Sequence, residues 1–157
     1  MKIKPAKSLK GKIILPGDKS ISHRAALLAS MAKGETRIKN FATSADCAST
    51  LKCLKDLGVE IFQENETVFI KSVGKKGFRK SKNLLNCGNS GTTVRLLSGI
   101  LAGQDFDTEL IGDESLSKRP MKRIIAPLTE MGAAIESNEN RLPLKIHGKK
   151  TLQSIKY

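Results

Sequence analysis

Two stretches of this sequence, residues 58–74 and 132–148, share one pattern, and this repeat limits the folds that the chain can adopt. GVEIFQENETVFIKSVG and GAAIESNENRLPLKIHG each begin and end with glycine, and each has a polar turn near its centre. Apolar residues on both sides of such a turn are typical of a strand pair. Two Ala/Leu-rich stretches that open at Arg24 and Arg95 repeat in the same way, 71 positions apart. We therefore predict two copies of a unit of about seventy residues.

Each unit is predicted to run strand, helix, strand, helix and then a strand pair, a βαβαββ order. In the first unit, about residues 11–74, these elements are 11–15, 22–33, 36–40, 45–57, 59–64 and 67–72. In the second unit, about residues 83–148, they are 83–86, 91–102, 108–112, 120–131, 134–137 and 142–146. Such alternation predicts an α/β fold in which each unit packs its helices against its own sheet.

Glycine and proline refine the predicted helix ends. Four glycines that follow apolar-periodic segments are expected to end helices in the left-handed conformation: Gly34, Gly58, Gly103 and Gly132. Pro120 suits a first helical position, and Pro127 is expected to kink the same helix.

The composition restricts the class of protein. A chain of 157 residues with 39% hydrophobic residues can form one globular domain with a sizeable core. Because no apolar stretch approaches the roughly eighteen residues of a membrane span, we predict a cytoplasmic protein with no membrane partner. Cys47, Cys53 and Cys87 form no CxxC pair, so neither a disulfide framework nor a metal site is expected. Cys87, beside a glycine loop, could be reactive or simply buried.

The net charge of +13 favours acidic partners, whether nucleic acid, an anionic membrane or small polyanions. Aromatic residues make up only 4% of the chain, so platforms on which single-stranded nucleic acid could stack are scarce. Nucleic acid is therefore the less favoured partner.

Three predicted helix starts carry cations, where the helix dipole favours anions: GDKSISHR at 17–24, GNSGTTVR at 88–95 and SKRPMKR at 117–123. The cations in question are Lys19, Arg24, Arg95, Lys118, Arg119, Lys122 and Arg123. A bound phosphate or carboxylate would accept the free N–H groups and neutralise these side chains together. The alternative at any one site is that the long side chains bend into water. Three such sites in one small chain favour anion binding.

No acid or base catalyst can be assigned from the sequence. Neither His23 nor His147 has a visible partner, and a lone histidine is more often structural. Asp46, Asp113 and Glu114 could act as acid or base, although Asp46 is equally suited to cap a helix. GDKS lacks the spacing of a Walker loop, which argues against ATP hydrolysis.

The segments LPGDKSISHRAALLA, GNSGTTVRLL and GDESLSKRPM together resemble the enolpyruvyl transferase family, in the right order and over essentially the whole chain. Members of that family have two lobes, each an inside-out α/β barrel of three βαβαββ units. The resemblance implies that residues 1–157 are a partial N-terminal lobe holding two of its three units. Residues 1–15 would belong to the hinge and the other lobe. The third unit, the C-terminal lobe as a partner and the family's proton-transfer residues would lie beyond Tyr157.

The resemblance also implies a function within the shikimate pathway of aromatic amino acid biosynthesis. The family members with these motifs transfer the enolpyruvyl group of phosphoenolpyruvate to the 5-hydroxyl of shikimate 3-phosphate, without a cofactor. Carried over by motif, Lys19 and Arg119 would be catalytic. The substrate-binding residues would be Lys19, Ser20, Arg24, Asn89, Gly91, Arg95 and Arg119. Because the chain spans little more than a third of a typical member, we expect it to bind substrates but not to turn them over alone.

Two other functions stay open from the residues. One is enolpyruvyl transfer to a UDP-amino sugar, which the SISHR segment fits poorly. The other is a basic nucleic-acid-binding α/β module, which the net charge of +13 suggests.

Overall fold

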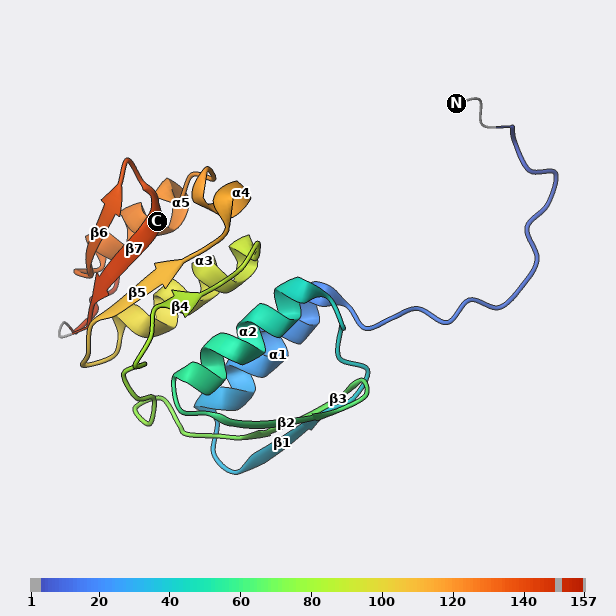
Figure 1. Ribbon diagram of the computed structural model, residues 1–157, viewed down its shortest axis with the longest axis horizontal. Coiled ribbons are helices and arrows are strands. Elements are labelled where there is room, and N and C mark those ends of the chain that lie inside the picture. Colours follow the sequence, from blue (N-terminus) through green and yellow to red (C-terminus); the bar gives the residue numbers. More distant parts are fainter. Residues whose placement is uncertain (1–3, 149–150, 157) are drawn as a thin grey trace.

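The computed structural model describes residues 4–148 and 151–156 and contains two α/β units joined by a connecting loop (Figure 1). The first unit consists of α1 (Lys19–Met31), β1 (Glu35–Ile38), α2 (Ala45–Asp56), β2 (Glu60–Glu64) and β3 (Thr67–Lys71). The second consists of β4 (Leu85–Asn86), α3 (Gly91–Ala102), β5 (Thr108–Ile111), α4 (Glu114–Ser117), α5 (Lys122–Glu130), β6 (Ala134–Asn138) and β7 (Arg141–His147). The predicted α/β fold of repeated units is confirmed.

Each unit has its own sheet, and the two sheets share a topology. The first has the strand order β1-β3-β2, all antiparallel, and the second has the order β4-β5-β7-β6. In the second sheet β4 runs parallel to β5, and the remaining pairs are antiparallel. β1-β3-β2 therefore corresponds to β5-β7-β6, and no strand among the described residues of the first unit corresponds to β4.

The strand predicted at residues 11–15 is wrong. Residues 4–18 have no helix or strand, and their four large apolar side chains are exposed. The exposed fractions are 91% for Leu9, 81% for Ile13, 88% for Ile14 and 73% for Leu15. In Figure 1 this segment extends away from the body of the molecule. A strand needs a neighbour to pair its backbone groups, and no described strand lies beside residues 11–15.

The division into units at 11–74 and 83–148, and the hinge role of residues 1–15, stay predictions. Residues 1–3 and Tyr157 lie outside the described residues.

Local capping explains where the observed helices differ from the predicted ones. α1 begins at Lys19, three residues before the prediction, because the Asp18 carboxylate accepts the Ile21 N–H at 2.6 Å. The predicted helix at 120–131 corresponds to α5, whose N-cap is Met121, and the short helix α4 before it was not predicted. Pro120 therefore precedes the cap and is not the first helical residue. Pro127 lies inside α5, as predicted.

The predicted left-handed conformation is confirmed at three of the four glycines. Gly58 and Gly132 directly follow a helix C-cap, as predicted, whereas Gly34 lies two residues after Ala32, the C-cap of α1. Gly34, Gly58 and Gly132 have φ values of +88°, +90° and +96°. The prediction for Gly103 is wrong, because its φ is −94°. Its N–H instead donates to Ile100 and Leu101 carbonyls, which closes α3 with a tight final turn.

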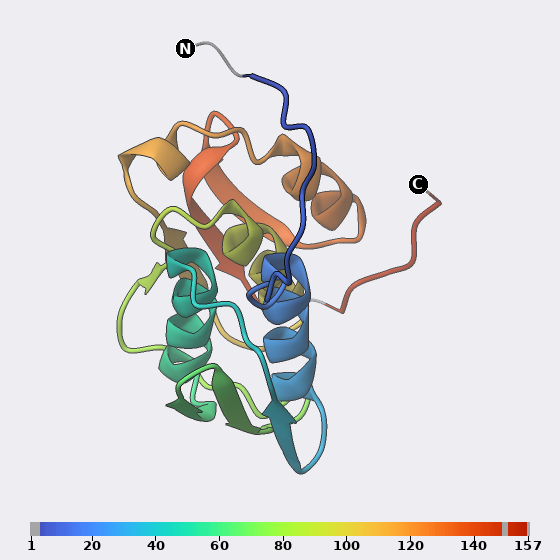
Figure 2. The same ribbon diagram turned by 90° about the vertical axis from the view of Figure 1, so that its right-hand side faces the viewer.

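The helices α1, α2 and α3 run in the same direction and begin at the same end of the molecule (Figures 1 and 2). At that end the Thr50 and Thr93 hydroxyl oxygens, from α2 and α3, lie 2.7 Å apart. At the other end Val73 N–H donates to the Ser30 carbonyl of α1, and the Gln104 amide after α3 donates to the Lys75 carbonyl. Buried apolar residues of all three helices contribute to one core. This packing places the helix starts of both units side by side.

Within residues 4–148 and 151–156, no helix combines the length and the apolar character needed to cross a membrane.

His147 of β7 links two acidic side chains, Glu136 of β6 and Asp107, which lies just before β5. His147 Nε2 lies 2.7 Å from Glu136 Oε1, and its Nδ1 lies 3.3 Å from Asp107 Oδ2. The hydrogen bond to Glu136, followed by the one to Asp107, raises the pKa of His147 above its ordinary value. The same contact holds the pKa of the Glu136 carboxyl below its ordinary value.

These shifts predict a stability difference that depends on pH. Because the pKa of His147 is raised in the folded state, its contribution is complete below about pH 6.5, its unfolded pKa. The contribution is lost as the pH rises through the folded pKa. Urea unfolding of the wild type and of His147→Gln from pH 5.5 to 9 should show a stability gap that narrows with rising pH. A gap that is constant over this range would contradict the prediction.

Candidate functional site

The start of α3 brings together several of the residues that the sequence singles out. Ser90 caps the helix by accepting the Thr93 N–H at 3.1 Å. Arg119 Nη2 donates to Asn89 Oδ1 at 2.7 Å, and Asn89 Nδ2 donates to Asp113 Oδ2 at 2.8 Å. The Asn89 amide thus links a guanidinium to a carboxylate across the turn, and its orientation is set by both.

Gly91 is the point at which two guanidinium groups meet. A Cβ atom on Gly91 would lie 2.4 Å from Arg95 Nη1 and 3.5 Å from Arg119 Nη1. Arg95 is held from its other side, where Nη2 donates to the Pro120 carbonyl at 3.4 Å. Two like charges beside the positive end of a helix create a strong field for an anion, and planar guanidinium groups suit carboxylate and phosphate. These contacts join four residues into one group, called here the Asn89 cluster: Asn89, Gly91, Arg95 and Arg119.

Lys19 lies on the first unit and forms an ion pair with Asp46. The side chain of Lys19 is 51% exposed and that of Asp46 is 24% exposed. Asp46 is not the cap of α2, because Ser44 accepts the Cys47 N–H and takes that role. The Asp46 carbonyl lies 3.4 Å from the Thr93 hydroxyl oxygen, so Asp46, the partner of Lys19, lies next to the start of α3.

Ser20 and Arg24 lie on α1, four positions apart, and both are exposed. A four-residue spacing places them on one helix face. Among the described residues, neither side chain has a hydrogen-bond or ion-pair partner. The structure therefore leaves both groups free for a ligand, and it does not bring them into contact with the Asn89 cluster.

The expected clash between cations and helix dipoles is only partly present. Lys19, Lys122 and Arg123 lie in the first turns of α1 and α5, whereas Arg24 and Arg95 lie one turn further in. Lys118 and Arg119 come just after the short helix α4, an end that favours cations, and Lys118 pairs with Glu114 at 2.5 Å. The prediction that they stand at a helix N-terminus is wrong.

The helices differ in whether an acidic residue offsets the positive end of the helix dipole. No first turn of α1, α3 or α5 holds a carboxylate, while α2 has Asp46 and α4 has Glu114 in that position. α5 also has no side-chain cap. Asp18, which the sequence analysis overlooked, supplies the compensating charge at α1 from the cap position.

Asp113, which the sequence offers as a possible acid or base, is the N-cap of α4. Its carboxylate caps α4 by accepting the Leu116 N–H at 2.8 Å and also accepts the Asn89 amide. These two contacts, the Leu116 N–H first, hold the pKa of Asp113 below its ordinary value. Asp113 is therefore ionised at neutral pH and orients the cluster, and it is not suited to be a general acid. Its position directly before Glu114 is a capping signal that the sequence contains.

The cysteines have no reactive character. All three are buried, and contact with Cys53 together with burial raises the pKa of the Cys87 thiol far above its ordinary value. Burial likewise raises the pKa of Cys47. In the part of the chain that the structure describes, no group of His, Cys, Asp and Glu side chains is arranged to hold a metal ion.

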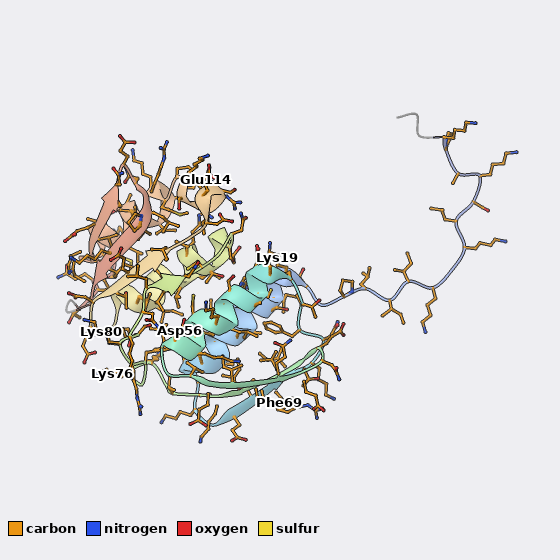
Figure 3. The ribbon with its side chains drawn as sticks, in the orientation of Figure 1. Lys19, Asp56, Phe69, Lys76, Lys80 and Glu114 are labelled. Carbon is orange, nitrogen blue, oxygen red and sulfur yellow. The ribbon has the colours of Figure 1, made fainter. Side chains whose placement is uncertain are left out.

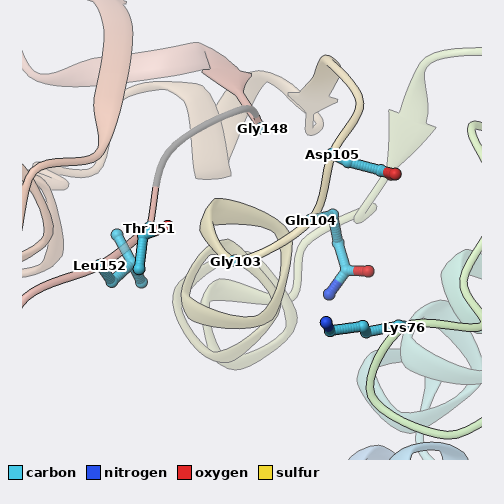
Figure 4. Close-up of a pocket in the computed structure, with 7 residues that line it drawn as sticks. All are labelled: Lys76, Gly103, Gln104, Asp105, Gly148, Thr151 and Leu152. Atoms are coloured by element: carbon cyan, nitrogen blue, oxygen red, sulfur yellow. The ribbon is translucent and has the colours of Figure 1, made fainter.

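Figure 3 shows that Lys19 lies at the starting end of the helices, with Asp56, Lys76 and Lys80 at the opposite end. A cavity of about 730 Å³ lies at that opposite end, beyond the last turn of α3 (Figure 4). Its lining residues are Lys76, Gly103, Gln104, Asp105, Gly148, Thr151 and Leu152. This cavity contains no residue of the predicted substrate site.

Comparison with known proteins shows the family to which the chain belongs. The family model for EPSP synthase (3-phosphoshikimate 1-carboxyvinyltransferase) matches residues 3–157. The chain belongs to the EPSP synthase family. The match contains the three segments that carry the Lys19 pair and the Asn89 cluster.

Several members of the EPSP synthase family are close relatives. The 3-phosphoshikimate 1-carboxyvinyltransferase of Vesicomyosocius okutanii is 54% identical over 155 residues, and that of Ruthia magnifica is 55% identical over 155 residues. Each alignment covers 99% of this chain and 36% of the relative. The solved EPSP synthase from Acinetobacter baumannii is 43% identical, with a TM-score of 0.89 over 94% of this chain and 34% of that one. The chain thus spans just over a third of the length of these relatives.

Gly91→Ala is expected to displace Arg95, because the added methyl group would stand 2.4 Å from its Nη1. The affinity for inorganic phosphate, followed by NMR at the amides of residues 89–93, should fall at least several-fold while the fold is kept. Gly99→Ala in the same helix is the matched control, since nothing lies within 4 Å of its Cβ position. That control should leave phosphate binding unchanged and raise the free energy of unfolding by about 0.5–1 kcal/mol. Equal phosphate affinity in both variants would contradict the assignment.

Proposed function

We propose that this chain provides the substrate-binding residues for enolpyruvyl transfer from phosphoenolpyruvate to the 5-hydroxyl of shikimate 3-phosphate. In this reaction the hydroxyl gives up its proton as its oxygen adds to C2 of phosphoenolpyruvate, and C3 gains a proton. The tetrahedral intermediate then loses inorganic phosphate and a proton from C3. The observation that carries the proposal is the convergence of Arg95 and Arg119 on Gly91, in a chain of the EPSP synthase family. The proposal is also supported by the matched relatives, which are named 3-phosphoshikimate 1-carboxyvinyltransferase.

The cluster at the start of α3 is proposed as the phosphoenolpyruvate side. Asn89, Gly91 and Arg119 would contact that substrate, with Arg95 supporting the turn. Both the carboxylate and the phosphate of phosphoenolpyruvate match guanidinium geometry, and cations placed beside the leaving phosphate would stabilise its developing charge. Because Asn89 is fixed between Arg119 and Asp113, this side would be organised before the substrate arrives.

The exposed face of α1 is proposed as the shikimate 3-phosphate side. Ser20 and Arg24 have no partners among the described residues and could both reach one phosphate. Lys19 would contact both substrates, which requires that an incoming anion compete with Asp46 for its ammonium group. Lys19 and Arg119 are the proposed catalytic residues, and no cofactor is required.

We propose further that residues 1–157 bind these anions without turning them over. The matched relatives are almost three times as long, and about two thirds of their length has no counterpart here. Substrate closure and proton transfer would then need a further lobe as partner.

Calorimetric and NMR titration of the 157-residue chain with shikimate 3-phosphate and with phosphoenolpyruvate tests the proposal. We expect saturable shifts at residues 19–24 with the first ligand and at residues 89–95 with the second. A UDP-amino sugar and a short RNA at low salt serve as controls for the two alternative functions. Binding of either control in place of shikimate 3-phosphate would refute the proposal, as would the absence of any shift at millimolar ligand.

Arg119→Lys keeps the charge but loses the planar pair of donors, so it separates geometry from charge. We expect the affinity for phosphoenolpyruvate to fall about tenfold, which corresponds to about 1.4 kcal/mol. Arg123→Lys is the matched control, because Arg123 is exposed and lies outside the Asn89 cluster. The dissociation constants of the two variants for phosphoenolpyruvate, measured by calorimetry at one ionic strength, decide the outcome. An equal loss of affinity in both variants would argue against a role of the planar donor pair of Arg119.

A further inference from the structure

A chain of buried polar side chains crosses the interface between the two units. His23 Nδ1 lies 2.6 Å from Thr50 Oγ1, and Thr50 Oγ1 lies 2.7 Å from Thr93 Oγ1. Thr93 Oγ1 in turn donates to Ser90 Oγ at 2.7 Å. The four residues come from α1, α2, α3 and the cap of α3, and none is more than 1% exposed. Buried polar groups in such a place are costly unless their partners are complete.

One atom in this row of four side chains has no partner among the described residues. That atom indicates which nitrogen of the His23 imidazole carries the hydrogen. His23 Nε2 is buried and unpaired. If Nε2 carried the hydrogen, a buried N–H would have no acceptor, which is rare in folded proteins. If Nδ1 carries it, that hydrogen goes to Thr50 Oγ1, and the atom left without a partner is an acceptor and not an N–H group. Burial lowers the pKa of His23, which agrees with a neutral ring, and the charged groups nearest to it are Asp46 and Lys19.

The Nδ1–H form gives the chain a single direction. His23 donates to Thr50, and Thr50 donates to Thr93, because each hydroxyl has one hydrogen to give. Thr93 has two acceptors within reach, Ser90 Oγ at 2.7 Å and the Asp46 carbonyl at 3.4 Å, and the nearer one, Ser90 Oγ, takes its hydrogen. Ser90 Oγ then accepts from both the hydroxyl and the backbone N–H of Thr93. The orientation of this oxygen determines how the first turn of α3 is capped.

We propose that His23 is a positioning residue for the anion-binding turn at the start of α3. Through Thr50 and Thr93 it fixes the Ser90 cap, and with it the first turn of α3, which contains Gly91 and is followed by Arg95. The inference rests on the proposed function, since it assigns His23 a role in that same site. His23 is next to Arg24 and one turn from Lys19 on α1, so the chain also sets the start of the first unit's helix against that of the second.

The ring tautomer is the first test. Long-range ¹H–¹⁵N spectra of the 157-residue protein at pH 6.5 and 7.5 report which nitrogen of His23 carries the hydrogen. We expect the Nδ1–H tautomer at both values, whereas an ordinary histidine would be about half protonated at the lower one. An Nε2–H tautomer would reverse the direction of the chain and would overturn the inference.

A matched pair of variants at Thr50 is the second test. Thr50→Val keeps the shape of the side chain and removes the hydroxyl, while Thr50→Ser keeps the hydroxyl. We expect Thr50→Val to accelerate hydrogen exchange of the Thr93 amide and to weaken inorganic phosphate binding three- to tenfold, about the effect of one hydrogen bond. Thr50→Ser should stay within twofold of the wild type in both measurements, even if both variants lose some thermal stability.

The outcomes separate this inference from the proposed function. If the wild type binds neither phosphate nor phosphoenolpyruvate, the proposed function fails, and the tautomer and the Thr93 exchange rates decide the role of His23 by themselves. If the wild type binds phosphate and the two Thr50 variants bind it equally well, His23 does not position the turn. Equal Thr93 exchange in the two variants would have the same meaning.

Discussion

The parallel packing of α1, α2 and α3 sets the electrostatics of the whole molecule. Because all three helices begin at one end, their positive dipole ends lie side by side, and the unpaired N–H groups of both units face the same region. Neighbouring dipoles that point the same way repel one another. The cost is met by burial of the apolar faces in one core, and at α1 also by the Asp18 cap. An anion bound between the helix starts would relieve the rest.

At the opposite end of the three helices, exposed cations lie near the negative ends of the helix dipoles. The loop that connects the two units carries Lys75, Lys76, Arg79, Lys80 and Lys82, all exposed. Arg79 N–H donates to the Leu57 carbonyl just after α2, and Gln104 holds the Lys75 carbonyl just after α3. These cations therefore lie close to helix C-termini, where the dipole favours them. Part of the net charge of +13 is explained by this structural role, which needs no nucleic acid partner.

Periodicity and glycine placement were enough to predict the order of the elements and most of their limits, because each unit repeats the same local signals. Residues 11–15 show where such reasoning fails. Their apolar pattern is that of a strand, but pairing depends on a neighbour that local sequence does not specify. The short helix α4 was not predicted because the capping role of Asp113 was not recognised, and the predicted helix at 120–131 begins two residues before α5, whose N-cap is the buried Met121.

The candidate site could be predicted in part. The glycine loop and its cations were apparent from the sequence, and the structure joins Asn89, Gly91, Arg95 and Arg119 as a cluster. Their substrate roles, and those of Ser20 and Arg24, remain proposals. The sequence could not show that Asp113 orients Asn89 or that His23 meets Thr50 and Thr93. Those contacts join residues 24, 27 and 43 positions apart, and they depend on how the two units pack.

The described part of the first sheet has an open edge at β1, which affects the behaviour of the chain in solution. β1 is an edge strand, and the backbone groups on its outer side face no described strand. Open edges are places where one polypeptide can pair with another and begin to aggregate. β1 limits this hazard by being only four residues long and by carrying Glu35 and Arg37, whose charges discourage a second copy from extending the sheet.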